Sequence, residues 1–215
     1  MTSSHLAQSS PDHVTHSGPR LVVAFQGERG AYADSAIDRV WGARVERLSC
    51  GTFVDVVQAV LSGRAGAGVL PLHNSIIGPI PGVAAALQDV VATGTGGIRG
   101  IEQGELVQVP VVHCLLGNTG ARLNEVRRVY SHPAALQQCR HFFAAHDWLT
   151  AVASYDTAGA AREVAAGGRA DEAAIAAEGC AARYGLQVLA RDIADEPENV
   201  TTFVVVAPRV RSGGV

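Results

Sequence analysis

From Leu21 onward, short hydrophobic runs of strand type alternate with segments of helical spacing, and this alternation limits the possible folds more than any other feature. The first strand-type runs span residues 21–27, 45–50 and 65–72, and the helix-type segments span 31–42, 52–63 and 80–94. A βαβαβ order of this kind predicts a mostly parallel sheet with helices on both faces.

A second set of alternating segments follows residue 100. Strand-type runs occur at 105–117, 127–131, 149–154, 186–193 and 201–208, and helix-type segments occur at 133–146, 157–168 and 172–185. The sequence therefore predicts an α/β protein of two lobes, with mixed, mostly parallel sheets and a ligand cleft between the lobes. We expect residues 21–100 and 196–210 to form lobe 1 and residues 101–195 to form lobe 2, with the final strand returning to lobe 1.

The composition favours a packed globular protein and leaves small acidic or neutral ligands open. The chain has 215 residues, of which 47% are hydrophobic, and a formal net charge of -3 with scattered basic residues. No basic stripe suited to nucleic acid is present, and no apolar run is long enough to span a membrane. We therefore expect neither nucleic acid nor a membrane as a partner.

The first residues and the cysteines bear on the cellular compartment. Residues 1–20 are polar and lack the apolar core of a signal peptide, so we expect a disordered arm and a cytoplasmic protein. The cysteines lie far apart and lack metal-ligand spacing, which predicts buried thiols and neither disulfides nor zinc.

Polar side chains gather where the predicted strands end. The clusters are "QGERGAY" at 26–32, "LHNS" at 72–75, "SHPAALQQC" at 131–139, "YDTAGAA" at 155–161 and "NVTTF" at 199–203. Each has a simple structural explanation when taken alone, because Asp156 or Ser131 is a good helix cap and a lone His113 or His132 is more often structural. Their recurrence at strand ends nevertheless predicts a binding site. The candidate substrate-binding residues from these clusters are Asn74, Ala31, Tyr32, Ser131, Thr157, Thr202 and Phe203.

From about Val22 to Val206 the chain resembles the catalytic domain of prephenate dehydratases and of the related plant arogenate dehydratases. The matching segments, in the family's order and spacing, are "VAFQGERGAYADSA", "GVLPLHNSIIGPI", "VHCLLGN", "RRVYSHPAALQQC", "DTAGAA", "YGLQVLARDI" and "NVTTFVVV". The resemblance implies two lobes like those of type II periplasmic binding proteins, prephenate in the cleft, and neither a metal nor an organic cofactor. It also implies that Thr201 meets the ring hydroxyl of the substrate.

The chain departs from the family pattern inside these motifs. The family usually has Glu in place of His73 and Arg in place of Thr202, and it often has Gln and Arg in place of Ala134 and Val112. Loss of a cation near a carboxylate favours simple decarboxylation, because the ground-state anion is then less stabilised than the more dispersed charge of the transition state.

After decarboxylation the ring carbanion needs a proton, and the replacement of the family's Glu by His73 suggests a source of that proton. An imidazole exchanges a proton near neutral pH, which the ionised Glu that it replaces does poorly. We therefore expect His73, Thr201 and Ser75 to be catalytic, with Asn74 beside them as a binding residue.

Three hypotheses on function remain open at this point. The first is a non-aromatising prephenate decarboxylase, similar to a subgroup of the family that supplies a dihydro-4-hydroxyphenylpyruvate to natural-product pathways. The second is a prephenate or arogenate dehydratase that gives phenylpyruvate or phenylalanine. The third is a binding module that kept the cleft and lost the chemistry. The resemblance also implies a homodimer or homotetramer, and we expect no phenylalanine-binding ACT domain in this chain.

Overall fold

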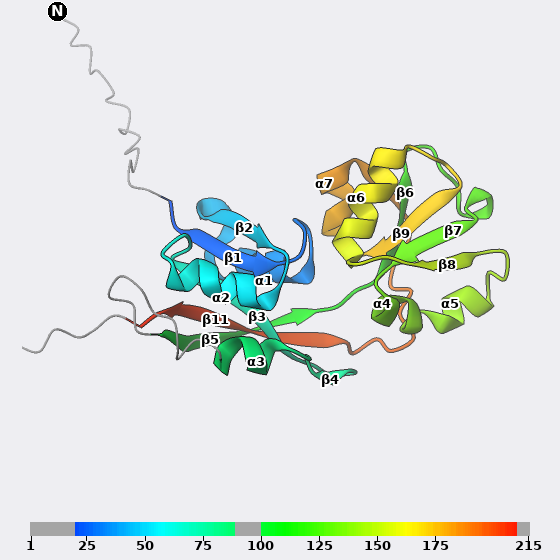
Figure 1. The fold of residues 1–215 in the computed structure, drawn as a ribbon. Helices are drawn as coiled ribbons and strands as arrows, with labels where there is room; N and C mark the ends of the chain where they lie inside the picture. Colours follow the sequence, from blue (N-terminus) through cyan, green and yellow to red (C-terminus); the bar gives the residue numbers. More distant parts are fainter. Residues whose placement is uncertain (1–19, 89–99, 210–215) are drawn as a thin grey trace, which may run out of the picture.

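The computed structural model describes residues 20–88 and 100–209, which form two lobes, each built on one β-sheet (Figure 1). Apart from Arg20, the arm expected at residues 1–20 lies outside the described residues. In the described part of the chain, no helix has the length and apolar character needed to cross a membrane.

Lobe 1 contains the first sheet, in the strand order β2-β1-β3-β11-β5 with the short β4 paired to β3. Its strands are β1 (Val22–Gln26), β2 (Glu46–Cys50), β3 (Ala67–Asn74), β4 (Gly78–Pro79), β5 (Ile101–Pro110) and β11 (Val200–Pro208). Helix α1 (Tyr32–Trp41) covers one face, and α2 (Phe53–Leu61) and α3 (Val83–Gln88) cover the other. A short 3-10 helix, η1 (Gly42–Arg44), follows α1.

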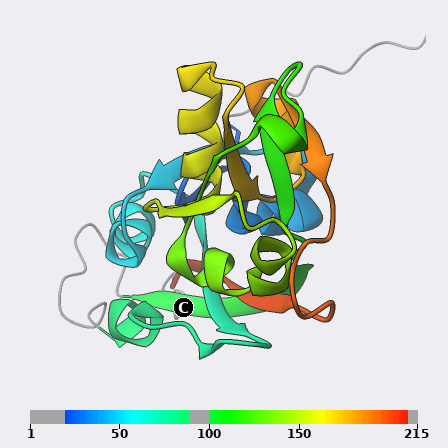
Figure 2. The same ribbon diagram turned by 90° about the vertical axis from the view of Figure 1, so that its right-hand side faces the viewer.

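Lobe 2 contains the second sheet, in the order β10-β6-β9-β7-β8. Its strands are β6 (Cys114–Asn118), β7 (Arg128–Ser131), β8 (Thr150–Ala153), β9 (Glu172–Ala176) and β10 (Leu186–Ala190), and the 3-10 helix η3 (Leu123–Glu125) precedes β7. Helices α6 (Thr157–Gly167) and α7 (Gly179–Tyr184) pack on one face. Helices α4 (Pro133–Gln137) and α5 (Arg140–Ala144) pack on the other (Figure 2).

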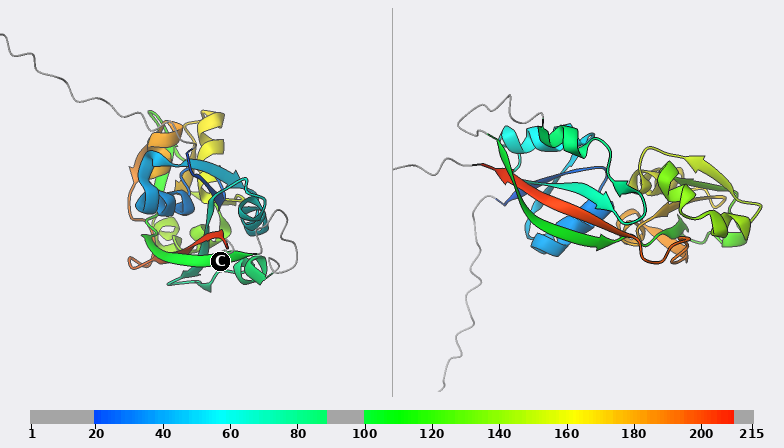
Figure 3. Two further views of the ribbon diagram at one scale, coloured as in Figure 1. Left: turned by 90° about the vertical axis from the view of Figure 1, so that its left-hand side faces the viewer. Right: turned by 90° about the horizontal axis from the view of Figure 1, so that it is seen from below.

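Both sheets follow one topological rule. Three strands lie parallel and side by side in each sheet: β2, β1 and β3 in lobe 1, and β8, β7 and β9 in lobe 2. The next strand in each sheet is antiparallel to both of its neighbours. This strand is β11 in lobe 1 and β6 in lobe 2, and each enters its sheet directly from the other lobe (Figure 3). This exchange of strands is the type II periplasmic-binding-protein-like arrangement, and the expected fold class is confirmed.

Two chain segments connect the lobes, and they are bonded to each other. The first runs between β5 and β6 and the second between β10 and β11. The Val111 amide donates to the Asn199 carbonyl oxygen at 2.8 Å, and the Ile193 amide donates to the His113 carbonyl oxygen at 3.0 Å. We call these two segments together the hinge.

The expected start of lobe 2 at residue 101 is wrong. Strand β5 pairs with β11 along nearly its whole length and therefore belongs to the first sheet. The run predicted as one strand over 105–117 is divided by Val111, Val112 and His113, which form the first hinge segment between β5 and β6. An unbroken hydrophobic run conceals this division because both of its halves are β-type sequence.

The helix predicted over 172–185 is also wrong in its first part. Residues Glu172–Ala176 form β9, an inner strand of the second sheet, and only Gly179–Tyr184 is helical. The alanines of β9 favour a helix locally, but the strand is covered on both faces by helices, and small side chains allow those helices to approach. Tertiary packing therefore overrides the local preference.

Smaller differences concern two other predicted helices. The helix expected over 133–146 is broken at Cys139 into α4 and α5, and the helix expected over 80–94 is described only as α3, since residues 89–94 lie outside the described ranges.

All cysteines are unpaired thiols, of which Cys50 is half-buried and Cys114, Cys139 and Cys180 are buried.

Gly68 in β3 allows α2 and β11 to pack closely around the centre of lobe 1. A β-carbon at this position would lie 2.9 Å from methyl groups of both Val206 and Val56. We predict that Gly68→Ala lowers the free energy of unfolding by about 1–3 kcal/mol, because the stiff valines must shift. The control is Gly179→Ala, where a β-carbon meets open space. Urea unfolding measures both, and equal effects in the two variants would contradict this explanation.

Candidate active site

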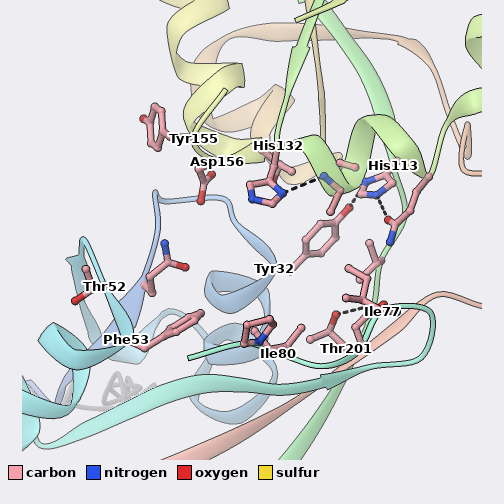
Figure 4. Close-up of a pocket in the computed structure, with 18 of the residues that line it drawn as sticks. Tyr32, Thr52, Phe53, Ile77, Ile80, His113, His132, Tyr155, Asp156 and Thr201 are labelled. Atoms are coloured by element: carbon pink, nitrogen blue, oxygen red, sulfur yellow. Dashed lines mark hydrogen bonds between the residues drawn. The ribbon is translucent and has the colours of Figure 1, made fainter. Parts of the chain in front are cut away.

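A cavity of about 680 Å³ lies between the lobes and is lined by residues from both. Figure 4 shows Tyr155, Asp156 and His132 of lobe 2 on one side, and Thr52, Phe53 and Ile80 of lobe 1 on the other. The other lining residues are Gln26, Tyr32, Gly51, Asn74, Ile77, Pro81, Val111, His113, Ala134, Ala135, Gln138, Thr157 and Thr201.

Helices begin at the cavity wall. Tyr32 opens α1, Phe53 opens α2 and Thr157 opens α6. Thr52 and Asp55 form a capping box at the start of α2, and Asp156 accepts from the Gly159 amide at the start of α6. Helix starts carry partial positive charge, so the cavity suits an anionic ligand.

Asn74, at the end of β3, is the most heavily bonded side chain of the cavity. Its Oδ1 accepts from the Ile76 and Ile77 amides at 3.0 and 3.1 Å. Its Nδ2 must therefore be the donor, and it donates to Asn199 Oδ1 at 2.6 Å and to Thr201 Oγ1 at 2.9 Å. Because Thr201 Oγ1 is the acceptor in this bond, the Thr201 hydroxyl proton is left for another partner.

The bonding continues from Asn199 into lobe 2. Asn199 Nδ2 donates to Gln138 Oε1 at 3.1 Å, and the same oxygen lies 2.8 Å from His113 Nε2. Since Gln138 Oε1 is an acceptor, His113 carries its proton on Nε2. We call the connected side chains the hinge network: Tyr32, Asn74, His113, Gln138, Asn199 and Thr201.

His113 is almost fully buried, and its far ring nitrogen, Nδ1, lies 3.1 Å from the Tyr32 hydroxyl oxygen. Burial lowers the pKa of His113 below its ordinary value, and the hydrogen bond to Gln138 partly offsets this. The neutral form is therefore favoured, with Nδ1 as the acceptor for Tyr32. The Tyr32 hydroxyl also lies 2.9 Å from the Val112 carbonyl oxygen, and burial raises its pKa.

Contacts between the lobes hold the loop after β1 against lobe 2. Glu28 pairs with Arg162 at 3.0 Å, and Cys180 Sγ donates to the Gly30 carbonyl oxygen at 3.2 Å. Gly27 has a φ of 103°, and a β-carbon there would lie 2.7 Å from the carboxylate of Asp156. Only glycine allows this close approach of the two lobes.

The charge of the cavity wall is unusual for an anion site. Asp156 is its acidic side chain, and burial raises the pKa of this carboxyl, while backbone amides at the start of α6 lower it. None of the lining residues is Arg or Lys. The positive potential available to a ligand from these lining residues therefore comes from helix starts and neutral donors.

The structure brings together part of the predicted site. Among the residues expected to bind substrate or to act in catalysis, those that line the cavity are Tyr32, Asn74, Thr157 and Thr201. Thr201 and Asn74 are directly bonded, as neighbouring residues of β11 and β3.

His73 does not line the cavity, and the expected placement of this residue is corrected. Opposite β11, Phe203 pairs with Pro71 but Thr202 pairs with His73, so β3 contains one extra residue. A bulge of this kind reverses which side chains face which side. Asn74 consequently shares a face with Thr201, whereas His73 is exposed and lies beside Thr202 on the other face.

The other predicted residues outside the cavity have structural contacts. Ser75 Oγ donates to the Glu198 carbonyl oxygen at 3.0 Å, and buried Ser131 donates to the Ile175 carbonyl oxygen at 2.7 Å. Phe203 is buried in the core beneath α1, and Ala31 precedes α1. Thr202 is half-buried and, like His73, is absent from the cavity wall.

Several cavity residues were not among the sequence candidates. His132 caps α4 by accepting from the Ala134 amide on Nδ1 at 3.2 Å, so its neutral ring carries the proton on Nε2. Thr52 and Phe53 come shortly after the end of β2, where the sequence contains none of the clusters quoted above. Gln138 lay within a quoted cluster, but its link to Asn199 joins residues 61 positions apart and is visible only in three dimensions.

No group of His, Cys, Asp or Glu suited to a metal ion occurs among residues 20–88 and 100–209. Thr201, Tyr32 and the helix starts could nevertheless hold a small polar ligand by hydrogen bonds alone.

Comparison with known proteins points to one family. The family model for prephenate dehydratase matches residues 23–211. Arogenate dehydratase/prephenate dehydratase 2 of Arabidopsis thaliana is 38% identical over 190 residues, which cover 88% of this chain and 47% of that protein. The bifunctional N-acyl-homoserine lactone acylase/prephenate dehydratase of Komagataeibacter europaeus is 36% identical over 191 residues, which cover 87% of this chain and 63% of that protein.

A solved structure shows the same fold. The prephenate dehydratase of Arthrobacter aurescens in complex with L-Phe has a TM-score of 0.76 and 30% identity, covering 91% of this chain and 62% of that chain. The present chain thus spans about half the length of its plant relative and under two thirds of the bacterial ones. On the family match over nearly its whole length, this chain belongs to the prephenate dehydratase family.

Proposed function

We propose that the chain is a lyase that removes the ring carboxylate of prephenate, or of its amino-acid counterpart arogenate. The observation that carries this proposal is the Thr201 hydroxyl, which lines the cavity and is bonded as an acceptor to Asn74. Its free proton is suited to the ring hydroxyl of the substrate. The helix starts around the cavity suit the carboxylates.

Our first candidate reaction is decarboxylation that keeps the ring hydroxyl. The bond between the ring carbon and its carboxylate breaks, carbon dioxide leaves, and the electron pair moves into the ring and is captured by a proton. The lack of Arg and Lys among the lining residues favours this course, because no side-chain cation assists the departure of hydroxide or stabilises the ground-state carboxylate.

His132 takes the place of His73 as the proposed proton donor. It lines the cavity, and its capping bond to the Ala134 amide occupies Nδ1 and leaves the proton on Nε2. An imidazole donates a proton near neutral pH as the imidazolium. His132 must therefore first take a proton on Nδ1, which breaks the capping bond to Ala134, and it returns to the neutral ring when Nε2 gives its proton to the ring carbon. His73 does not line the cavity, and it lies exposed on the opposite face of β3 from Asn74.

The second candidate reaction is dehydration, in which carbon dioxide and hydroxide leave together and the ring becomes aromatic. The names of the Arabidopsis and Komagataeibacter relatives favour it. Thr201 would then donate its proton to the departing hydroxyl, so the same residue serves both candidates.

Product analysis separates the candidates. The protein is incubated with prephenate and, separately, with arogenate, and products are followed by absorbance and mass. From prephenate we expect a non-aromatic keto acid that has lost carbon dioxide and keeps its hydroxyl, and from arogenate the corresponding non-aromatic amino acid. Phenylpyruvate or phenylalanine would establish the dehydratase in its place, and unchanged substrates would indicate a binding module.

Thr201 should be essential for turnover in either reaction. We predict that Thr201→Ala lowers kcat by about tenfold or more, since the ring hydroxyl loses its partner in a buried site. The matched control is Thr202→Ala, which removes the same atoms from the adjacent residue on the opposite face. Steady-state kinetics on both variants test this, and equal losses would remove Thr201 from its proposed role.

His132 and His73 offer a second matched pair. His132→Asn keeps a side chain able to cap α4 but cannot transfer a proton, and we predict a loss of about tenfold or more in decarboxylation. His73→Asn should lose less than about twofold, because the side chain faces away from the cavity. Formation of the keto acid is measured for both, and a larger loss in His73→Asn would return the role to that residue.

A further inference from the structure

Gln138 is the member of the hinge network that lobe 2 contributes. It follows α4, whereas Asn74 and Thr201 belong to strands of lobe 1 and His113 and Asn199 lie in the hinge segments. Its Oε1 accepts from Asn199 and His113 at once. One oxygen of lobe 2 therefore terminates hydrogen bonds from both hinge segments.

The direction of every bond between Gln138 and Thr201 is fixed. Backbone amides of Ile76 and Ile77 orient the Asn74 amide, which must then donate to Asn199 Oδ1. Because Asn199 Oδ1 accepts this bond, the other end of the amide, Nδ2, is the donor, and it donates to Gln138 Oε1. Without that acceptor, the Asn199 amide loses the partner that holds its orientation.

We propose that Gln138 is a positioning residue that couples the placement of lobe 2 to the orientation of the Thr201 hydroxyl, through Asn199 and Asn74. Asn74 and Asn199 are nearly fully buried, so water cannot readily replace a lost partner. Separation of the lobes withdraws the Gln138 oxygen and loosens the pair that holds Thr201. The reactive hydroxyl is then aligned only when the lobes are in the arrangement seen here. This inference rests on the proposed function of Thr201.

A double-mutant cycle on the whole chain tests the coupling. Gln138→Met keeps the length of the side chain and removes its acceptor, and we expect kcat on prephenate to fall about tenfold or more while KM changes less than about threefold. In the Thr201→Ala background the same substitution should cost less than about twofold, because the hydroxyl to be aligned is gone. Gln138→Glu keeps an acceptor oxygen and should recover most of the lost turnover.

Two results of this cycle would overturn the proposed coupling. Multiplicative losses in the double variant, or a raised KM with unchanged kcat, would show that Gln138 acts on the substrate directly and would overturn the coupling. Gln137→Met is the control, since Gln137 is the exposed neighbour in α4 and does not line the cavity. Gln138→Asn, whose amide is shorter by one methylene, carries the same test if the Met variant does not fold.

A spectroscopic readout separates failure of this inference from failure of the proposed function. The side-chain amide resonances of Asn74 and Asn199 are compared by ¹⁵N NMR in the wild type, Gln138→Met and Gln137→Met, without substrate. We expect both amides to shift only in Gln138→Met. A shift confined to Asn199, with Asn74 unchanged, would overturn the coupling even if the protein proves inactive on prephenate.

Discussion

The amide of Asn74 is the interaction on which the site depends. It accepts from the amides of Ile76 and Ile77, which fixes the turn after β3, and it donates to Asn199 in the hinge and to Thr201 in β11. Only 4% of its surface is exposed, so a lost partner would leave a buried polar group unsatisfied, at a cost of about 1–3 kcal/mol. One side chain thus joins a turn, the hinge and the proposed reactive hydroxyl.

The exchange of strands explains why these groups meet. β11 returns from lobe 2 to lie between β3 and β5, which brings Thr201 beside Asn74 although 127 positions separate them. The same exchange creates the two hinge segments, and the first of them reaches the cavity through Val111 and His113. Alignment of the hydroxyl and placement of the lobes are therefore properties of one hydrogen-bonded assembly.

Local pattern predicted the two lobes, the cleft and the polar cluster that contains Asn74, because strand ends and helix starts are marked in the sequence by polar residues after hydrophobic runs. The role expected of Thr201 came from the resemblance to the family. Prediction from local pattern failed where tertiary packing or strand register determines the structure. β9 is an alanine-rich strand because helices press on both its faces, and His73 is turned from the cavity by one extra residue in β3. The bonds of Gln138 to His113 and Asn199 have no local signature at all.

The most direct measurement of the central claim is a crystal structure with an unreactive dicarboxylate analogue that keeps the ring hydroxyl. The distance that decides is the one between Thr201 Oγ1 and the hydroxyl oxygen of the analogue. Our proposal predicts about 2.5–3.0 Å, with the Asn74 bond to Thr201 retained. An analogue bound between the lobes with its hydroxyl beyond about 4 Å from Thr201, or one that contacts His73 in its place, would contradict it.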